Sequence, residues 1–268
     1  MDCNTYVRRK NLRFGTNQNP LKSKTKCIVF ENKNRTKPKN IILDGNKLPW
    51  AREVTHLGCT LEANNKMSKD MTVKRCIFNN RANSLIQEFH YCSPEVLMKC
   101  VNSYTTSFVG SQLWSIRSQG CDRIFKSWNV LVRTIFSLDR TTHRSLIEPI
   151  SSERHIKNSL CSRFAKFADK ITRSDKFIVR FLSNLIKDDL RTVFGNNLHY
   201  ISQLCGVSYA DLTQPIVRNK LKYWNHDESD DWRVGFAKEL HGLLNDDGYL
   251  DGFSPDELCT IFRFICTQ

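Results

Sequence analysis

Two pairs of adjacent aspartates, Asp188-Asp189 and Asp246-Asp247, are the carboxylates whose spacing first suggests metal chemistry. Two-metal catalysis requires carboxylates that converge on the same ions. Neighbouring residues on a helix point about 100° apart, so a helical pair does not converge. We therefore expect Asp188-Asp189 to lie near a helix end or in a turn and not to bind metal.

His143 could act as a general acid or base, because an unperturbed histidine titrates near neutral pH. No activating residue stands near it in the sequence, so we expect it to form a hydrogen bond between helices. The chain has no GxSxG motif of a serine hydrolase. Its 11 glycines are dispersed and form no phosphate-binding loop. We expect no catalytic residue of these classes.

The 11 cysteines have spacings that oppose a zinc site. Structural zinc is usually held by two closely spaced pairs of Cys or His, and the chain contains no CxxC. The nearest approaches are His56-x-x-Cys59 and His90-x-Cys92, and neither has a second pair downstream at the usual spacing. We expect no metal, no cofactor, and reduced thiols that are mostly buried, as in a cytoplasmic or nuclear protein.

Charge is distributed unevenly along the 268 residues, which carry a net charge of +14. Residues 1–40 carry +9 (11 basic, 2 acidic), residues 41–224 carry +12 (27 basic, 15 acidic), and residues 225–268 carry −7 (3 basic, 10 acidic). Basic side chains gathered in this way favour a phosphate-binding surface. The alternative is a solvated basic face without a partner. No run of about 18 apolar residues occurs and no signal peptide is visible, so we expect neither a membrane span nor secretion.

Short strands are expected to precede helices. Asp44-Gly45 is a strong turn dipeptide, and Pro49 breaks the stretch that follows it. We expect residues 26–61 to pair as a small β-unit whose tip, near Leu57-Gly58, faces the next helix. The runs that favour strands are residues 26–30, 41–43 and 54–61.

From about Asn65 the apolar residues recur at helical spacing, and we expect these stripes to be core. Ser93-Pro94-Glu95 predicts a helix start, because serine accepts an unpaired amide, proline suits the first turn and glutamate complements the helix dipole. A shorter helix is expected at residues 177–186. The stripes of the longer helices are Met71, Phe78, Ala82, Leu85 and Phe89; Leu97, Val101, Tyr104 and Phe108; Ile124, Trp128, Leu131 and Ile135; and Ile156, Leu160, Phe164, Phe167 and Ile171.

The last segment repeats this pattern on an acidic background. Residues 226–231 form a polar, acidic loop and a plausible linker. Residues 254–257 (SPDE) form a capping box that predicts a short terminal helix. The apolar residues of that helix are Leu258, Ile261, Phe262 and Ile265.

Two stretches carry a family resemblance: residues 14–30, FGTNQNPLKSKTKCIVF, and residues 54–61, VTHLGCTL. Together they resemble the last palm elements of the reverse transcriptase of non-LTR (LINE-type) retrotransposons. In that family a helix end, a lysine cluster and a β-strand are followed by the primer grip, a hairpin with a Leu-Gly tip. Here the lysine cluster includes Lys22 and Lys24, and the tip matches Leu57-Gly58.

Three later motifs also look like the C-terminal part of these elements' second reading frame. They are residues 141–144 (TTHR), 163–167 (RFAKF) and 196–198 (NNL). The ending at residues 257–267 is similar to some natural C-termini of the family. The resemblance covers roughly residues 11–268, and the order and spacing of the motifs carry it.

The resemblance implies an α+β fold in four parts. Residues 1–62 correspond to a remnant of the palm with the primer-grip hairpin, a small antiparallel or mixed β-unit. Residues 63–138 correspond to a thumb-like helical bundle, residues 139–224 to a helical C-terminal region, and residues 225–268 to an acidic loop and terminal helix.

The family's palm elements follow a strand with an aromatic-Ala-Asp-Asp motif whose aspartates hold Mg²⁺. Only residues 1–13 precede the match, so we expect the metal-binding aspartates to be missing and the chain not to be an enzyme as it stands. The implied function is that of a catalytically incomplete fragment of an RNA-directed DNA polymerase, of the kind that 5′-truncated insertion leaves. A thumb helix of the family follows the backbone of the RNA or DNA template-primer.

We therefore expect sequence-nonspecific nucleic-acid binding to persist. The residues expected to carry it are Lys22, Lys24, Leu57, Gly58, Lys66, Lys69, Lys74, Arg75 and Arg81. The alternative is a basic helical scaffold for protein interactions that has no nucleic-acid function. A third interpretation is a piece that complements a separate polymerase subunit in trans.

Overall fold

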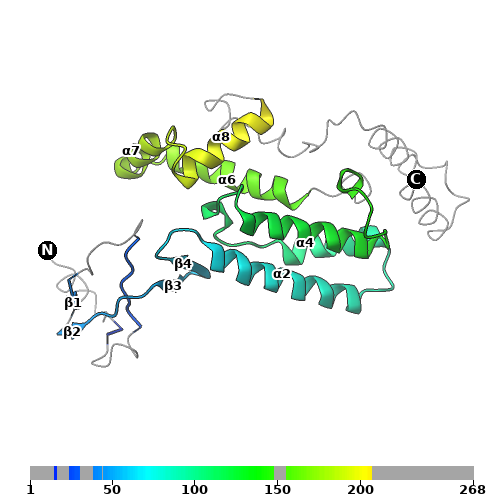
Figure 1. Ribbon diagram of the computed structural model, residues 1–268, viewed down its shortest axis with the longest axis horizontal. Helices are drawn as coiled ribbons and strands as arrows, with labels where there is room; N and C mark the ends of the chain where they lie inside the picture. Colours follow the sequence, from blue (N-terminus) through cyan, green and yellow to red (C-terminus); the bar gives the residue numbers. More distant parts are fainter. Residues whose placement is uncertain (1–14, 17–23, 31–38, 44, 148–154, 207–268) are drawn as a thin grey trace, which may run out of the picture. The chain divides into compact units, whose positions relative to one another are not determined.

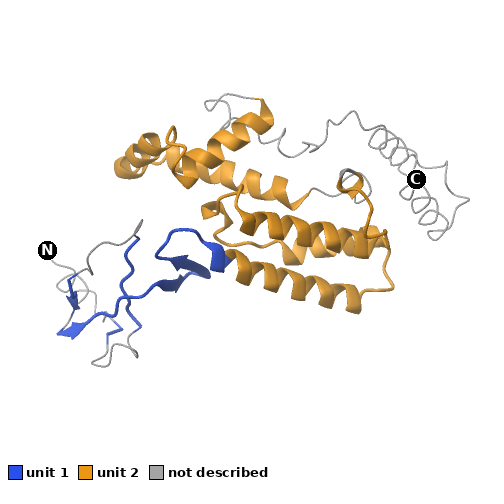
Figure 2. Cartoon of the chain, in the orientation of Figure 1, with its two compact units in different colours: residues 1–70 blue, residues 71–268 orange. Residues whose placement is uncertain are grey.

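The computed structural model describes residues 15–16, 24–30, 39–43, 45–147 and 155–206. The chain divides into two compact units, Met1–Asp70 and Met71–Gln268, shown in blue and orange in Figure 2. The described residues form two antiparallel two-stranded sheets followed by six α-helices (Figure 1). The expected α+β class is thereby confirmed. The expected acidic loop, capping box and terminal helix lie outside the described residues.

The N-terminal unit contains two hairpins. In the first, β1 (Ile42–Leu43) pairs with β2 (Asn46–Lys47). In the second, β3 (Glu53–His56) pairs with β4 (Cys59–Glu62). Residues 54–61, expected as one run that favours a strand, therefore lie in a hairpin of their own.

A second turn explains this difference. Leu57 and Gly58 have φ values of 48° and 75°. Two consecutive positive φ values match the hairpin turns whose twist suits the flanking strands. The expected strand at residues 26–30 is also absent: Cys27 forms an isolated parallel bridge with Trp50 and no ladder.

The helix α2 (Ser68–Glu88) starts against the second hairpin. The carboxylate of Glu62 accepts hydrogen bonds from the Ser68 hydroxyl at 3.1 Å and from the Lys69 amide at 2.8 Å, which caps the helix. The buried Asp70 carboxylate accepts from the Thr60 amide at 2.8 Å. These bonds join the strands of the hairpin to the first helical turn, whereas Leu57 at the tip is 82% exposed.

Most of the remaining helices follow the predicted periodicities. Tyr104 is the exception: it was expected in the core but is 68% exposed, because the buried face of its helix includes Met98 and Thr105 instead. Ser93 caps the second helix as expected, with its hydroxyl 3.5 Å from the Val96 amide. The helix α8 was not predicted, because Gly195 and two asparagines interrupt its apolar pattern. The bounds are α3 (Pro94–Thr105), α4 (Gln119–Ile135), α6 (Ile156–Thr172), α7 (Phe177–Ile186) and α8 (Val193–Cys205), with 3₁₀ turns η2 (Ser111–Leu113) and η3 (Arg144–Leu146).

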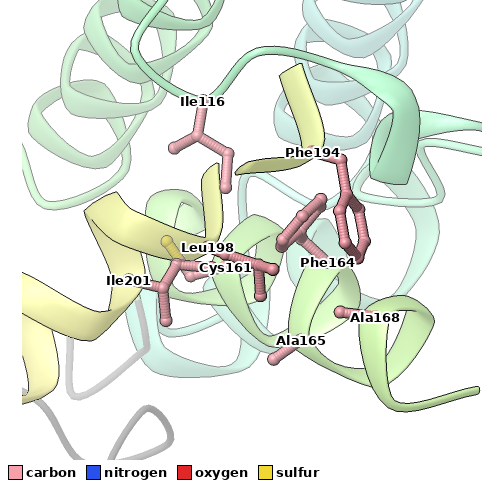
Figure 3. Close-up of a cluster of buried hydrophobic side chains, with 8 residues drawn as sticks. All are labelled: Ile116, Cys161, Phe164, Ala165, Ala168, Phe194, Leu198 and Ile201. Carbon is pink, nitrogen blue, oxygen red and sulfur yellow. The ribbon is translucent and has the colours of Figure 1, made fainter. Parts of the chain in front are cut away.

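Two clusters form the core of the C-terminal unit. In the first, the ring of Phe78 lies 6.0 Å from that of Phe108 and 6.3 Å from that of Trp128, which joins α2 to α4. The second joins α6 to α8, and its rings Phe164 and Phe194 are 5.6 Å apart (Figure 3). Its buried members are Ile116, Cys161, Phe164, Ala165, Ala168, Phe194, Leu198 and Ile201. Within the described part of the chain, no helix combines the length and apolar character needed to cross a membrane.

Candidate nucleic-acid interface

A groove of about 350 Å³ lies between α2 and α4 in the C-terminal unit. Its lining contains three cations and no carboxylate. The lining residues are Arg75, Asn79, Ala82 and Asn83 from α2, and Arg123, Lys126, Ser127, Val130, Leu131 and Thr134 from α4.

The amphipathic pattern of α4 positions its share of the groove. Ile124 and Trp128 are almost fully buried and fix the orientation of the helix. Positions 123, 126, 127, 130 and 134 then fall together along a neighbouring face, because residues three and four apart are neighbours on a helix. Arg123 and Lys126 are exposed at this face. The helix thus presents two cations followed by a hydroxyl-bearing and apolar stretch.

The facing part of α2 supplies Arg75, which is half-buried, and the amides of Asn79 and Asn83. Arg75 and Arg123 offer guanidinium donors, which match the geometry of phosphate oxygens, and Lys126 adds a compact charge. Because its lining contains no carboxylate, the groove is itself cationic and attracts an anion. The groove is chemically suited to a phosphate group.

Lys74, also expected to bind nucleic acid, does not lie at this surface. Its side chain is buried, its Nζ lies 5.6 Å from the ring centroid of Trp114, and it donates a hydrogen bond to the carbonyl of Val109. Lysine can bury its aliphatic stem and hold its charge over an aromatic face. Lys74 therefore serves packing.

The other expected residues are scattered. Arg81 is exposed on α2 and does not line the groove, while Lys69 is exposed and ion-paired with Glu53. Lys24 and Lys66 are exposed in the N-terminal unit, and Lys22 lies outside the described residues. Arg75 is the one expected cation that the described structure places in the groove.

Leu57 and Gly58 form the tip of the second hairpin, as the resemblance implies. Leu57 is exposed and adopts a left-handed backbone conformation, which is uncommon for a residue with a large side chain. Strained positions of this kind often mark functional turns. Leu57 and Gly58 therefore remain predicted contacts for nucleic acid, within the N-terminal unit.

The guanidinium groups of two further arginines form hydrogen bonds within the protein. The guanidinium of Arg163 donates to the carbonyls of Thr106 at 2.6 Å and Phe108 at 3.4 Å, beyond the end of α3. Arg133 donates to the carbonyl of Thr142 at 2.7 Å. Burial lowers the pKa of both groups. The motifs at residues 163–167 and 141–144 thus each contribute a residue to a hydrogen bond that stabilises the fold.

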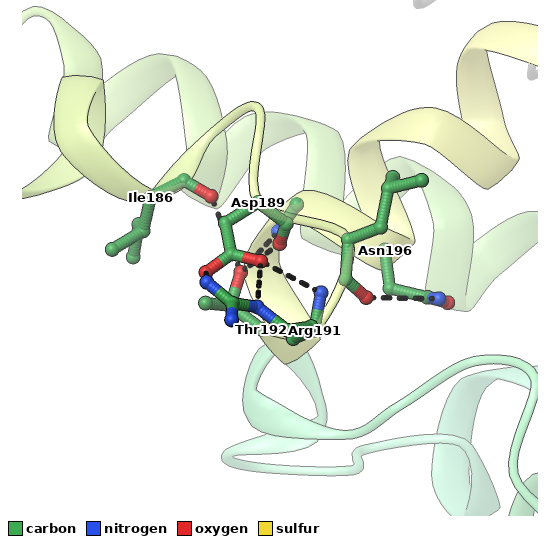
Figure 4. A network of polar contacts seen from close by, with 7 residues as sticks. Ile186, Asp189, Arg191, Thr192 and Asn196 are labelled. Carbon is green, nitrogen blue, oxygen red and sulfur yellow. Dashed lines mark hydrogen bonds and ion pairs between the residues drawn. The ribbon is translucent and has the colours of Figure 1, made fainter.

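Asp188-Asp189 lies in the turn between α7 and α8, as expected (Figure 4). The carboxylate of Asp189 accepts bonds from the guanidinium of Arg191 at 2.9 and 3.0 Å, and these hydrogen bonds lower the pKa of Asp189. Thr192 caps α8 next to this pair by accepting from the Gly195 amide. Among residues that the structure describes, no group of three potential metal ligands occurs. His143 is exposed just before η3, and its carbonyl accepts from the Leu146 amide.

Arg123 and Lys126 are the residues that sequence reasoning missed. The prediction of the third helix depends on its apolar stripe alone. A signal was present, because positions 123, 126, 127, 130 and 134 recur at steps of three and four beside that stripe. What the sequence lacks is any indication that this face lies opposite Arg75.

Comparison of the chain with family models, with curated proteins and with solved structures finds no match.

Proposed function

We propose that this chain is a nucleic-acid-binding, thumb-like part of a retrotransposon-type RNA-directed DNA polymerase that does not itself carry the catalytic aspartates. The groove between α2 and α4 supports the proposal most directly, because three cations and no carboxylate line it. The order of the palm, primer-grip and thumb motifs supports the family assignment. The ligand is the sugar-phosphate backbone of RNA or DNA.

Contacts to phosphates predict weak, sequence-independent binding that falls steeply with salt. Each neutralised phosphate contributes a slope of roughly 0.7–0.9 in log K against log salt. Replacing Arg75, Arg123 and Lys126 with alanine should therefore reduce the slope by about two to three units if all three make contacts. A filter-binding titration from low to physiological salt, with oligonucleotides of unrelated sequence, measures this slope.

A matched control removes the same charge from another surface of the same unit. Lys166, Lys170 and Lys176 are exposed and do not line the groove. Their triple alanine variant has the same net charge as the groove variant and should retain most of the parent slope. Equal slopes for the two triple variants would assign binding to overall charge and reject the groove.

A second expectation concerns catalysis. In-line nucleotidyl transfer by two metal ions requires converging carboxylates, and Asp189 is engaged with Arg191. The purified chain should incorporate no nucleotide on any template-primer with Mg²⁺ or Mn²⁺. Robust, template-dependent incorporation, measured by primer extension, would overturn the proposal that it lacks its own catalytic aspartates.

The interaction scaffold remains a second candidate because α7 has an exposed apolar face. Phe177, Ile178, Phe181, Leu182 and Leu185 are each 48–69% exposed. Scaffold function predicts binding to proteins through apolar helix faces and no salt-dependent affinity for nucleic acid. The same filter-binding titration separates the two candidates.

A further inference from the structure

The residues that line the groove between α2 and α4 are ordered along its length, because these neighbouring helices run parallel (Figure 1). Met71 and Cys121 lie at one level, with their sulfur atoms 3.8 Å apart. Phe78 and Trp128 lie at a second level, with ring centroids 6.3 Å apart. Both pairs are 50 positions apart in the sequence (121 − 71 and 128 − 78). A residue of α2 is therefore level with the residue of α4 that stands 50 positions later.

This register gathers the positive charge at one end of the groove. Arg75, Arg123 and Lys126 lie at levels that differ by about three residues, or about 5 Å along the helix axes. Beyond the level of Lys126 the lining contains no charged residue. The groove thus has a cationic end and an uncharged end.

The carboxylates of the two helices lie away from the groove. Asp70 is buried and accepts a hydrogen bond from a backbone amide of the second hairpin at 2.8 Å. Asp122 points about 100° away from Arg123 around the axis of α4. Glu88 is the last residue of α2, beyond the stretch that lines the groove. The cationic end therefore keeps its charge.

The uncharged end combines an apolar floor with hydrogen-bonding groups. Ala82 and Leu131 are buried and form the floor. The amides of Asn79 and Asn83 each offer donors and an acceptor. The two hydroxyls that α4 contributes donate to carbonyls of their own helix at 3.0 Å, so their oxygens remain acceptors. These groups match the apolar face and the polar edge of an unpaired nucleobase.

A nucleic-acid strand that ran lengthwise through the groove would not fit this distribution. Each nucleotide carries a phosphate, so such a strand would place phosphates beside Val130 and Leu131, where the lining has no cation. A single nucleotide with its phosphate at the cationic end and its base at the other places each part beside a complementary surface. The lined stretch from Arg75 to Asn83 is about 12 Å long, which suits one nucleotide.

We propose that the groove holds one nucleotide of a single strand, with its phosphate against the three cations and its unpaired base between the amides of Asn79 and Asn83. This inference rests on the proposed function and specifies its ligand as single-stranded RNA or DNA. A base in a duplex would have to leave its pair and its stack before it could enter, which costs free energy. Because an asparagine amide can present either its donors or its acceptor, the contact accepts any base.

Three DNA probes of equal length separate the contribution of the base from that of the phosphate. They are a single strand, a strand built from stable abasic residues, and the same single strand in a duplex. In filter binding to the full-length chain at low salt, the intact strand should bind about tenfold more tightly than the abasic strand, which carries the same phosphates. It should also bind more tightly than the duplex. Charge alone predicts the reverse order, since a duplex carries twice as many phosphates per unit length.

A double variant on α2 locates the base contact. Asn79→Ala combined with Asn83→Ala should reduce the preference for the intact over the abasic strand to about twofold, because two hydrogen bonds to the base are lost. The control is Asn80→Ala combined with Gln87→Ala, which removes two exposed amides of the same helix that do not line the groove. It should keep the tenfold preference. Alanine favours helix, so both variants should fold, which circular dichroism checks.

The possible failures of the two proposals are distinguishable. Equal affinity for the intact and abasic strands, with a salt slope that falls in the triple variant of the groove cations, would reject the nucleotide site and retain the proposed function. Tighter binding of the duplex with the same slope would have the same meaning. A preference that survives the double asparagine variant would place the base contact elsewhere and reject this site. A chain that binds none of the three probes would reject both proposals.

Discussion

At the scale of single residues, Asn197 shows how one polar side chain can fix the arrangement of several elements. It is fully buried on α8, donates to the Trp114 carbonyl at 2.7 Å and accepts from the Ile116 amide at 3.0 Å. Both partners lie in the segment between η2 and α4. A buried backbone group that loses its partner costs about 1–3 kcal/mol. Asn197 therefore satisfies two groups that water cannot reach.

Asn197→Ala should lower the free energy of unfolding by about 2–4 kcal/mol, because it leaves one carbonyl and one amide unpaired. Urea denaturation followed by tryptophan fluorescence measures the change. The adjacent Asn196 provides the control, since its amide lies 3.4 Å from the Leu190 carbonyl in an exposed position. Asn196→Ala should shift stability by about 0.5 kcal/mol or less. Similar losses in both variants would refute the role of Asn197.

The sequence predicts only in part which side chains are buried. The expected stripe of α2 ran from Met71 directly to Phe78, and Lys74 sits at the position that fills this gap, three residues after one and four before the other. Helical geometry alone would have placed Lys74 on the buried face. Its charge suggested solvent instead, because the partner that accommodates it, Trp114, is 40 residues away and carries no local signal.

At the scale of elements, most helices and the tip of the second hairpin were predictable, but the pairing of the other strands was not. The bounds of α7 match the expected residues 177–186, and the stripes of α2, α4 and α6 define their helices. Each helix is specified by a repeat within its own sequence. The turn at Leu57-Gly58 was expected, but the β-prone run at residues 26–30 forms only the isolated bridge between Cys27 and Trp50. Strand pairing is decided by partners that local patterns do not encode.

The approach of α8 to the turn after α7 depends on Gly195. A Cβ added there would lie 2.4 Å from the Asp189 carbonyl oxygen and 2.9 Å from that of Ile186, and both atoms belong to the backbone. Backbone cannot move aside as easily as the end of a flexible side chain. The position therefore favours glycine despite its low helix propensity.

Gly195→Ala should destabilise the C-terminal unit by about 1–3 kcal/mol, the usual cost of overpacking, although alanine is intrinsically the better helix former. Gly120→Ala is the matched comparison in α4, where the added Cβ would meet the Met71 Sδ at 2.6 Å. Since a methionine side chain can change rotamer, this second variant should lose less stability. Thermal unfolding of both variants decides the order, and a more stable Gly195→Ala protein would contradict the close approach.

At the scale of the whole molecule, two surfaces of the C-terminal unit differ in chemistry. The groove between α2 and α4 is cationic, and the exposed face of α7 is apolar. The sequence revealed the excess of positive charge but not the groove, because Arg75 and Arg123 come from different helices. The change of charge along the chain, basic through residue 224 and acidic after it, is evident from the sequence alone.

Global stability should also respond to alkaline pH through two buried thiols. Burial raises the pKa of Cys121 and of Cys161 to about 12, from an ordinary value of 9.0. Between these values the unfolded chain loses the thiol proton while the folded protein keeps it. The unfolded state then binds fewer protons, so the stability that is fully present below pH 9 falls as the pH rises towards 12. At pH 10 the loss is about 1.4 kcal/mol for each thiol.

Cys161→Ala removes one of these thiols and so should remove about 1.4 kcal/mol of the stability that the parent loses between pH 8 and pH 10. The substitution also leaves a small cavity, but that cost is the same at both pH values and cancels from the comparison. Urea unfolding of parent and variant at pH 8 and pH 10, under reducing conditions, gives the difference directly. A variant whose stability falls as steeply as that of the parent would show that the Cys161 thiol is not shielded from water in the folded protein.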